Sequence, residues 1–214
     1  MGGSIGHPKV TAGTLGCFAA FLDGEAPSPL ILSNNHVLAN ENSAEAGDIT
    51  LQPGRVDGGK VAHDRVGALT RFVRLKKTGN LVDAAVSAID PGLWYYPNWM
   101  KGTQVLSGVR KNPAREGEVV RKVGRTTGVT VGRIRAVELD PAVTYDLGRL
   151  RFVNQIEIEP IGNQPFSLGG DSGSLIVDEK GRALGLLFAG NDTDTTYANP
   201  ISTVLESLQI RLVF

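Results

Sequence analysis

The stretch Gly169-Gly170-Asp171-Ser172-Gly173-Ser174 decides how the rest of this chain is interpreted, because it places a serine between glycines with no bulky side chain until Leu175. Glycines before and after the serine permit a tight turn and the close approach of a substrate carbonyl. In such a turn the amides of Gly170 and Ser172 can point into one cavity and stabilise an oxyanion. An ordinary glycine-rich loop before a buried strand is the alternative interpretation.

A serine hydroxyl becomes a good nucleophile only when a base, most often histidine, accepts its proton. The chain has three histidines, His7, His36 and His63, and all of them precede Ser172. The chain order Ser-Asp-His is therefore impossible. A histidine-first order, as in chymotrypsin-like enzymes, and the order Asp-His-Ser of subtilisins remain open.

His36 is the best candidate for the base. It follows the apolar run Leu30–Ser33, which predicts a short buried strand, and it begins a segment, 34–40, that suits a single helical turn. A histidine there can face a cleft while the next two side chains anchor the turn. A half-buried histidine bonded to backbone is the alternative, and we expect His7 and His63 to be surface residues.

Asp83 is the candidate acid, because it stands directly before the small apolar run 84–89 and follows Leu81 and Val82. A carboxylate in these surroundings is expected to be buried, and a buried charge needs a partner. His36 is the natural partner, since a carboxylate can orient an imidazole and stabilise its cation. The alternative is an exposed aspartate that caps the strand.

Composition excludes several functions. The 214 residues carry no net charge, and the pI is about 6.8, so we expect no electrostatic capture of nucleic acid or of an anionic membrane. No run approaches the roughly 18 apolar residues of a membrane span. With 27 glycines and 11 prolines, the chain has the many turns typical of an all-β fold.

Cysteine usage and the first residues bear on location. Cys17 is the only cysteine, so no disulfide can form within the chain, and a reducing compartment is favoured. The segment 1–8 lacks the basic and apolar regions of a signal peptide. We therefore expect a cytoplasmic protein.

The order of these motifs resembles that of the chymotrypsin-fold serine proteases: Ser-Asn-Asn-His36, then Asp83 before an apolar strand, then Gly-Asp-Ser172-Gly-Ser. The stretch Gly124-Arg125-Thr126-Thr127-Gly128 is similar to a strand motif of the bacterial, α-lytic-type branch. Together with Asn163-Gln164, it also resembles the trypsin-like domain of the plant NARROW LEAF protein and its bacterial relatives.

The resemblance implies an all-β fold of two six-stranded antiparallel Greek-key barrels with a short C-terminal helix. Residues 1–112 would form the first barrel with His36 and Asp83, and residues 113–214 the second with Ser172. Apolar residues at 201, 204, 205 and 208 predict the helix. The aromatic-rich segment 91–101 resembles the crossover between barrels, with its rings packed, and the run 150–158 predicts one further strand.

The same resemblance implies a serine endopeptidase that acts on protein or peptide substrates without a metal or cofactor. Ser172 would attack the carbonyl, His36 would accept and return the proton, and Asp83 would fix the histidine tautomer. The amides of Gly170 and Ser172 would hold the oxyanion. Because an unregulated intracellular protease is hazardous, we expect a gate such as assembly into a homo-oligomer or a regulatory partner.

Further positions match the family's supporting residues. Lys122 aligns with the basic residue that neutralises Asp171 in the α-lytic branch, and Arg121 and Arg125 are alternatives. Phe188 stands where a serine commonly supports the catalytic aspartate, which is a departure from the family pattern.

Specificity follows from the same alignment. Phe166 would lie at the base of the specificity pocket, with Phe188, Ala189 and Gly190 beside it. Without a charge at the base, cleavage after lysine or arginine is disfavoured, and a medium apolar residue is preferred. Two other functions remain open, namely a catalytically silent protease-fold interaction module and an esterase.

Overall fold

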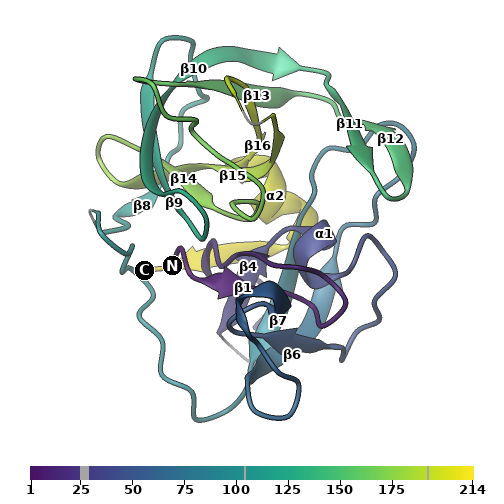
Figure 1. Ribbon diagram of the computed structural model, residues 1–214. Coiled ribbons are helices and arrows are strands. Elements are labelled where there is room, and N and C mark those ends of the chain that lie inside the picture. Colours follow the sequence, from purple (N-terminus) through teal and green to yellow (C-terminus); the bar gives the residue numbers. More distant parts are fainter. Residues whose placement is uncertain (25–28, 104, 192) are drawn as a thin grey trace.

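The computed structural model describes residues 1–24, 29–103, 105–191 and 193–214, and most of its strands belong to two sheets that form the lower and upper halves of Figure 1. Both chain ends lie between the halves. The first sheet is built mainly from the N-terminal half of the chain, and the second from the C-terminal half.

The first sheet has six antiparallel strands in the order β17-β3-β4-β7-β6-β5. The strand β4 pairs with β7 although β5 and β6 intervene in sequence, which is a Greek-key connection. Every residue of β3 and β4 is buried, as expected for continuous apolar runs. The strands are β3 (Cys17–Phe21), β4 (Leu30–Ser33), β5 (Ile49–Leu51), β6 (Arg65–Phe72), β7 (Ala85–Ile89) and β17 (Ile210–Val213).

The second sheet closes on itself. Its order is β14-β9-β10-β13-β16-β15, and β14 also pairs with β15, so six strands form a barrel, to which β8 adds in parallel at its outer side. The strands are β8 (Gly108–Val109), β9 (Val119–Gly124), β10 (Gly128–Leu139), β13 (Gln155–Pro160), β14 (Leu175–Asp178), β15 (Arg182–Gly190) and β16 (Thr196–Pro200).

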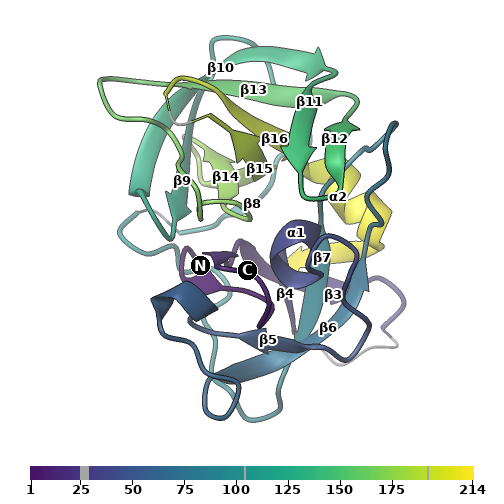
Figure 2. The same ribbon diagram turned by 45° about the vertical axis from the view of Figure 1, so that its right-hand side comes forward.

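Smaller elements lie along the seam between the sheets. The turn α1 (Asn35–Leu38) faces the hairpin of β11 (Ala142–Tyr145) and β12 (Gly148–Arg151), which descends from the upper half in Figure 2. The others are the pair β1 (Ser4–Ile5) and β2 (Gly13–Thr14), the 3-10 turn η1 (Arg55–Asp57) and the helix α2 (Ile201–Leu208). No helix in the described part of the chain is long and apolar enough to cross a membrane.

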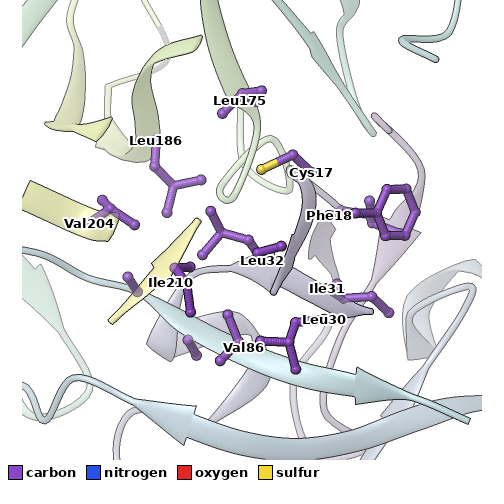
Figure 3. Packing of buried hydrophobic residues seen from close by; sticks show 14 of the residues in the cluster. Cys17, Phe18, Leu30, Ile31, Leu32, Val86, Leu175, Leu186, Val204 and Ile210 are labelled. Atoms are coloured by element: carbon purple, nitrogen blue, oxygen red, sulfur yellow. The ribbon is translucent and has the colours of Figure 1, made fainter. Parts of the chain in front are cut away.

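One hydrophobic core continues across the seam. Leu175 and Leu186 of the second sheet belong to the same buried cluster as Cys17 and Leu32 of the first, and Figure 3 shows them converging. Burying each large apolar side chain contributes about 1.5–3 kcal/mol. This shared packing fixes one half against the other, and with it the distance between residues that the two halves carry.

The predicted all-β architecture with a C-terminal helix is confirmed, with the helix at Ile201–Leu208 and the turn after Ser33 at Asn35–Leu38. The predicted division at residue 112 stays a prediction. Pairing in the sheets crosses it twice, because β8 joins the second sheet and β17 joins the first.

Two local expectations are wrong. The run 150–158 is not one strand, because β12 and β13 are separated at Asn154, which has a positive φ of 60°. The aromatic rings of segment 91–101 do not all pack. The ring centroid of Tyr95 lies 5.0 Å from that of Phe18, whereas Trp94 is 95% exposed. Tyr96 and Trp99 are exposed as well.

Candidate active site

His36 lies at the start of α1, where the buried strand β4 gives way to a helical turn. Val37 and Leu38 are buried beneath the turn and anchor it in the core. The His36 side chain is 21% exposed and lines a cavity at the seam. The sequence pattern predicted this arrangement.

Asp83 is completely buried, and its carboxylate makes two contacts with His36. Its Oδ2 lies 2.5 Å from His36 Nδ1, and its Oδ1 accepts a hydrogen bond of 3.3 Å from the His36 backbone amide. Because an ionised carboxylate can only accept, the ring proton lies on Nδ1. The opposite ring nitrogen, Nε2, is then free to accept a proton.

Tyr145 completes the hydrogen bonding of Asp83, and the sequence analysis missed it. Its hydroxyl donates to Asp83 Oδ2 at 2.8 Å, and its ring stands edge-on to His36 with centroids 5.8 Å apart. Burial raises the pKa of Tyr145 well above its usual range, aided by the Asp83 charge, so the phenol remains a donor. The Glu41 carboxylate accepts hydrogen bonds from the backbone amides of Asp146 and Leu147 and so holds the turn of the β11–β12 hairpin in place.

By the family resemblance, Phe188 stands where a serine commonly supports the catalytic aspartate. Its ring packs against Phe152 at 4.5 Å between centroids, and Phe152 stacks on Tyr145 at 6.0 Å. Phe188 therefore helps to support the aromatic layer behind Tyr145, whose hydroxyl bonds the carboxylate in place of the serine.

The backbone around Asp83 is fixed from both halves of the molecule. Its amide donates to Asn199 Oδ1 at 3.0 Å, from β16, and its carbonyl accepts from Asn34 Nδ2 at 2.7 Å. Asn199 is in turn oriented by Gln155 Oε1 at 2.6 Å. A buried amide network of this kind leaves Asp83 little freedom to move.

The electrostatic balance at His36 favours the cation. Burial lowers the pKa of His36, but the charge and hydrogen bond of Asp83, together with the charge of Glu41, outweigh burial and raise it. An imidazole in this setting is a stronger base than a free one.

Ser172 lines the same cavity as His36, which has a volume of about 260 Å³ and opens to solvent between the halves. Within the described part of the chain, the two side chains do not hydrogen-bond to each other. Contacts between a nucleophile and its base are commonly loose without substrate and tighten when it binds. The structure thus brings His36, Asp83 and Ser172 to one site, with the last contact open.

The turn around Ser172 has the backbone that the glycines predicted. Gly170 has a φ of +95° and Gly173 a φ of +92°, conformations that favour glycine. A Cβ at Gly173 would collide with the Ser33 side chain. Neither the Gly170 amide nor the Ser172 amide donates a hydrogen bond to another described residue, so both are available to a ligand.

Asp171 is buried beside Lys122, whose Nζ lies 3.5 Å from Asp171 Oδ2, and neither side chain is exposed. Burial lowers the pKa of Lys122, and Asp171 opposes that shift. Arg125, one of the two alternatives, pairs with Asp57 through both of its carboxylate oxygens. Lys122, rather than Arg125, therefore supplies the buried counter-charge that Asp171 requires.

The specificity-pocket prediction needs one correction. Phe188, Ala189 and Gly190 line the cavity, but Phe166 is not among the described residues that do, because its ring is buried in the core of the second barrel. Ser167 takes its place, and its hydroxyl lies 2.7 Å from Thr196 Oγ1.

The other two histidines do not reach the cavity. His7 is buried, contrary to the prediction, and its Nε2 lies 3.4 Å from Asp48 Oδ2, whereas His63 is exposed as expected. No group of three or more potential metal ligands among His, Cys, Asp and Glu occurs in the described ranges.

No known family model matches the chain, and no curated protein matches it in sequence. Solved structures do match. A protease of Nocardiopsis has a TM-score of 0.68 at 20% identity, covering 100% of this chain and 97% of that one. The α-lytic protease homologue N4 has a TM-score of 0.66 at 20% identity, covering 99% and 97%.

A glutamic acid specific serine protease that uses a histidine triad in substrate binding has a TM-score of 0.68 at 18% identity, covering 99% of this chain and 98% of that one. The chain therefore has the chymotrypsin fold, in the form seen in bacterial serine proteases of the α-lytic type. The resemblance to the NARROW LEAF family stays a prediction.

Asp83→Asn should lower the pKa of His36. The substitution removes the negative charge that raises this pKa, while burial, which lowers it, remains. Proton NMR titration of the His36 ring reports the change directly. The His63 signal is the internal control and should not differ between the two proteins, and an unchanged His36 titration would contradict the electrostatic role of Asp83.

Proposed function

We propose that the protein is a serine endopeptidase with His36, Asp83 and Ser172 as its catalytic residues. The observation that carries the proposal is the buried Asp83 carboxylate 2.5 Å from His36 Nδ1, with Ser172 in the same cavity. A buried acid, an imidazole and a serine in one cleft form the constellation that serves acyl transfer on several unrelated folds.

In the proposed reaction Ser172 Oγ attacks the peptide carbonyl, and its proton passes to His36 Nε2. Asp83 stabilises the resulting imidazolium, while the Gly170 and Ser172 amides stabilise the oxyanion. The imidazolium then gives its proton to the leaving amine, and water repeats the cycle on the acyl-enzyme. Only neutral His36 accepts the proton, so activity should rise with pH through the raised pKa of His36.

Ser172→Ala should abolish covalent labelling by a fluorophosphonate probe that marks the wild-type protein at this serine. Peptide hydrolysis should fall by about 10⁶, the scale on which loss of a serine nucleophile lowers kcat. Mass spectrometry of the labelled peptide is the measurement, and Ser202→Ala, which removes an exposed serine hydroxyl of α2 outside the cavity, is the control. Equal labelling of the wild type and Ser172→Ala would end the proposal.

The cavity supports cleavage after an uncharged residue. Ser167, Leu168 and Leu187 line it, and the Ser167 hydroxyl is bonded to Thr196 Oγ1. The acidic side chain among the described lining residues, Glu41, already accepts two backbone amides. A lysine or arginine side chain would have to compete with these amides and with His36 for the Glu41 carboxylate.

We expect cleavage of a peptide library after medium apolar residues, with product sequences read by mass spectrometry. Ser172→Ala purified in parallel corrects for contaminating proteases. Dominant cleavage after arginine or lysine would contradict the assignment of the pocket. Cleavage after glutamate would do so as well, since the histidine triad of the glutamic acid specific relative has no counterpart among the described residues lining this cavity.

The open contact between His36 and Ser172 favours one second candidate, a latent or silent protease-fold module that binds peptides or proteins. Labelling with the fluorophosphonate separates the two, because a silent module would not react. Comparison of ester and peptide turnover separates a peptidase from an esterase. Cytoplasmic location and control by a gate remain part of the proposal, on the grounds of the single cysteine and of the hazard of free proteolysis.

A further inference from the structure

We infer that the Thr126 hydroxyl is a positioning residue for the oxyanion hole, which it holds open by anchoring the peptide between Gly169 and Gly170. The inference rests on the proposed peptidase function and adds to it a residue outside the triad. Thr126 lies in the turn between β9 and β10, and its Oγ1 donates to Gly169 O at 2.7 Å.

The effect follows from the geometry of a peptide bond. In a planar trans peptide the carbonyl oxygen of one residue and the amide proton of the next point in opposite directions. Fixing Gly169 O toward Thr126 therefore fixes the Gly170 N–H to point away from Thr126. Gly169 and Ser172 both line the cavity, and Gly170, whose amide is fixed in this way, lies between them in sequence.

The second amide of the hole is set in the same way. Asp171 O accepts hydrogen bonds from the Ser174 amide at 3.0 Å and from the Ser174 hydroxyl at 2.6 Å. Its peptide partner, the Ser172 N–H, must then point the other way. Each proposed oxyanion donor thus belongs to a peptide whose carbonyl is anchored from behind.

Thr126 itself is held firmly. Its amide donates to Asp171 Oδ1 at 2.8 Å, and its hydroxyl accepts from Arg125 Nη1 at 3.1 Å. Because that hydroxyl has a single proton and already accepts from Arg125, the proton is directed to Gly169 O. Arg125 in turn pairs with Asp57 of the first half.

The neighbouring residues leave no substitute for this contact. The Thr127 hydroxyl bonds Asp171 Oδ2 at 2.7 Å, and Thr14 Oγ1 donates to the next carbonyl, Gly170 O, at 2.9 Å. A Cβ at Gly170 would lie 2.6 Å from Thr126 Oγ1, so the glycine permits the close approach. Among the described residues, Thr126 alone provides a side-chain hydrogen bond to Gly169 O.

The test replaces Thr126 with valine, which keeps the shape and loses the hydroxyl, and with serine, which restores it. Losing an oxyanion donor outright lowers kcat by about 10²–10³, so we expect Thr126→Val to lose roughly ten- to a hundred-fold in kcat, with KM nearly unchanged. Thr126→Ser should retain wild-type turnover. Thr70→Val, which removes a hydroxyl bonded to Ala68 O in the first sheet, is the distant control.

A peptidyl trifluoromethyl ketone with leucine before the ketone gives a readout that packing alone would not move. Ser172 Oγ adds to the ketone, and the resulting hemiketal oxygen occupies the oxyanion position. Its pKa, followed by fluorine NMR, should rise by about one unit or more in Thr126→Val, since a tenfold loss of stabilisation corresponds to about one unit. Urea unfolding checks that each variant is folded, and Thr126→Ala is the second variant if valine prevents folding.

The outcomes separate cleanly. The inference is wrong if the hemiketal pKa of the Thr126→Val adduct equals that of the wild-type adduct. It is also wrong if the valine and serine variants lose kcat equally. Either result leaves the proposed peptidase intact. A wild-type protein that neither labels nor forms the adduct would overturn both.

Discussion

The Asp83 carboxylate is the constraint on which the site depends, because a fully buried charge is stable only if its surroundings satisfy it. Three donors do so: His36 Nδ1, the His36 amide and the Tyr145 hydroxyl. They come from different parts of the chain, α1 in the first half and the β11–β12 hairpin in the second. The same contacts that stabilise the charge also orient the His36 imidazole, so the chain orients this ring as it buries Asp83. The raised pKa of His36 is the electrostatic consequence.

The seam between the halves turns this local constraint into a property of the whole fold. The core of Leu175, Leu186 and Leu32 is continuous across it, and β17 returns the end of the chain to the first sheet. Polar contacts cross the same boundary, since Asn199 bonds the Asp83 amide and the Thr14 amide donates to Ser172 O at 2.7 Å. His36 lies in the turn after β4 of the first sheet, and Ser172 lies in the turn before β14 of the second. Ser172 and Asp83, the partner of His36, are each hydrogen-bonded to the opposite half. A change in how the halves dock would therefore alter the site directly.

Local signals predicted the parts of the site that depend on local chemistry. A glycine-boxed serine, a histidine after a buried strand and an aspartate before one carry their structural context in sequence. The pairing of Lys122 with Asp171 was expected from the family resemblance instead. Tyr145, Asn199 and Gln155 could not be found in this way, because their roles arise from tertiary contacts that leave no periodicity. Phe166 was misplaced by one residue, as its neighbour Ser167 faces the cavity while its own ring fills the core. The burial of His7 was missed for the same reason, since Asp48 meets it only in the folded chain.

The most direct test of the central claim is a crystal structure of the protein with a peptidyl boronic acid. We predict a covalent bond from Ser172 Oγ to boron, one boronate oxygen within hydrogen-bond distance of the Gly170 and Ser172 amides, and the other near His36 Nε2, with His36 Nδ1 still on Asp83. A boronate bound elsewhere, or bound at Ser172 with its oxygens facing away from these amides and from His36, would contradict the account.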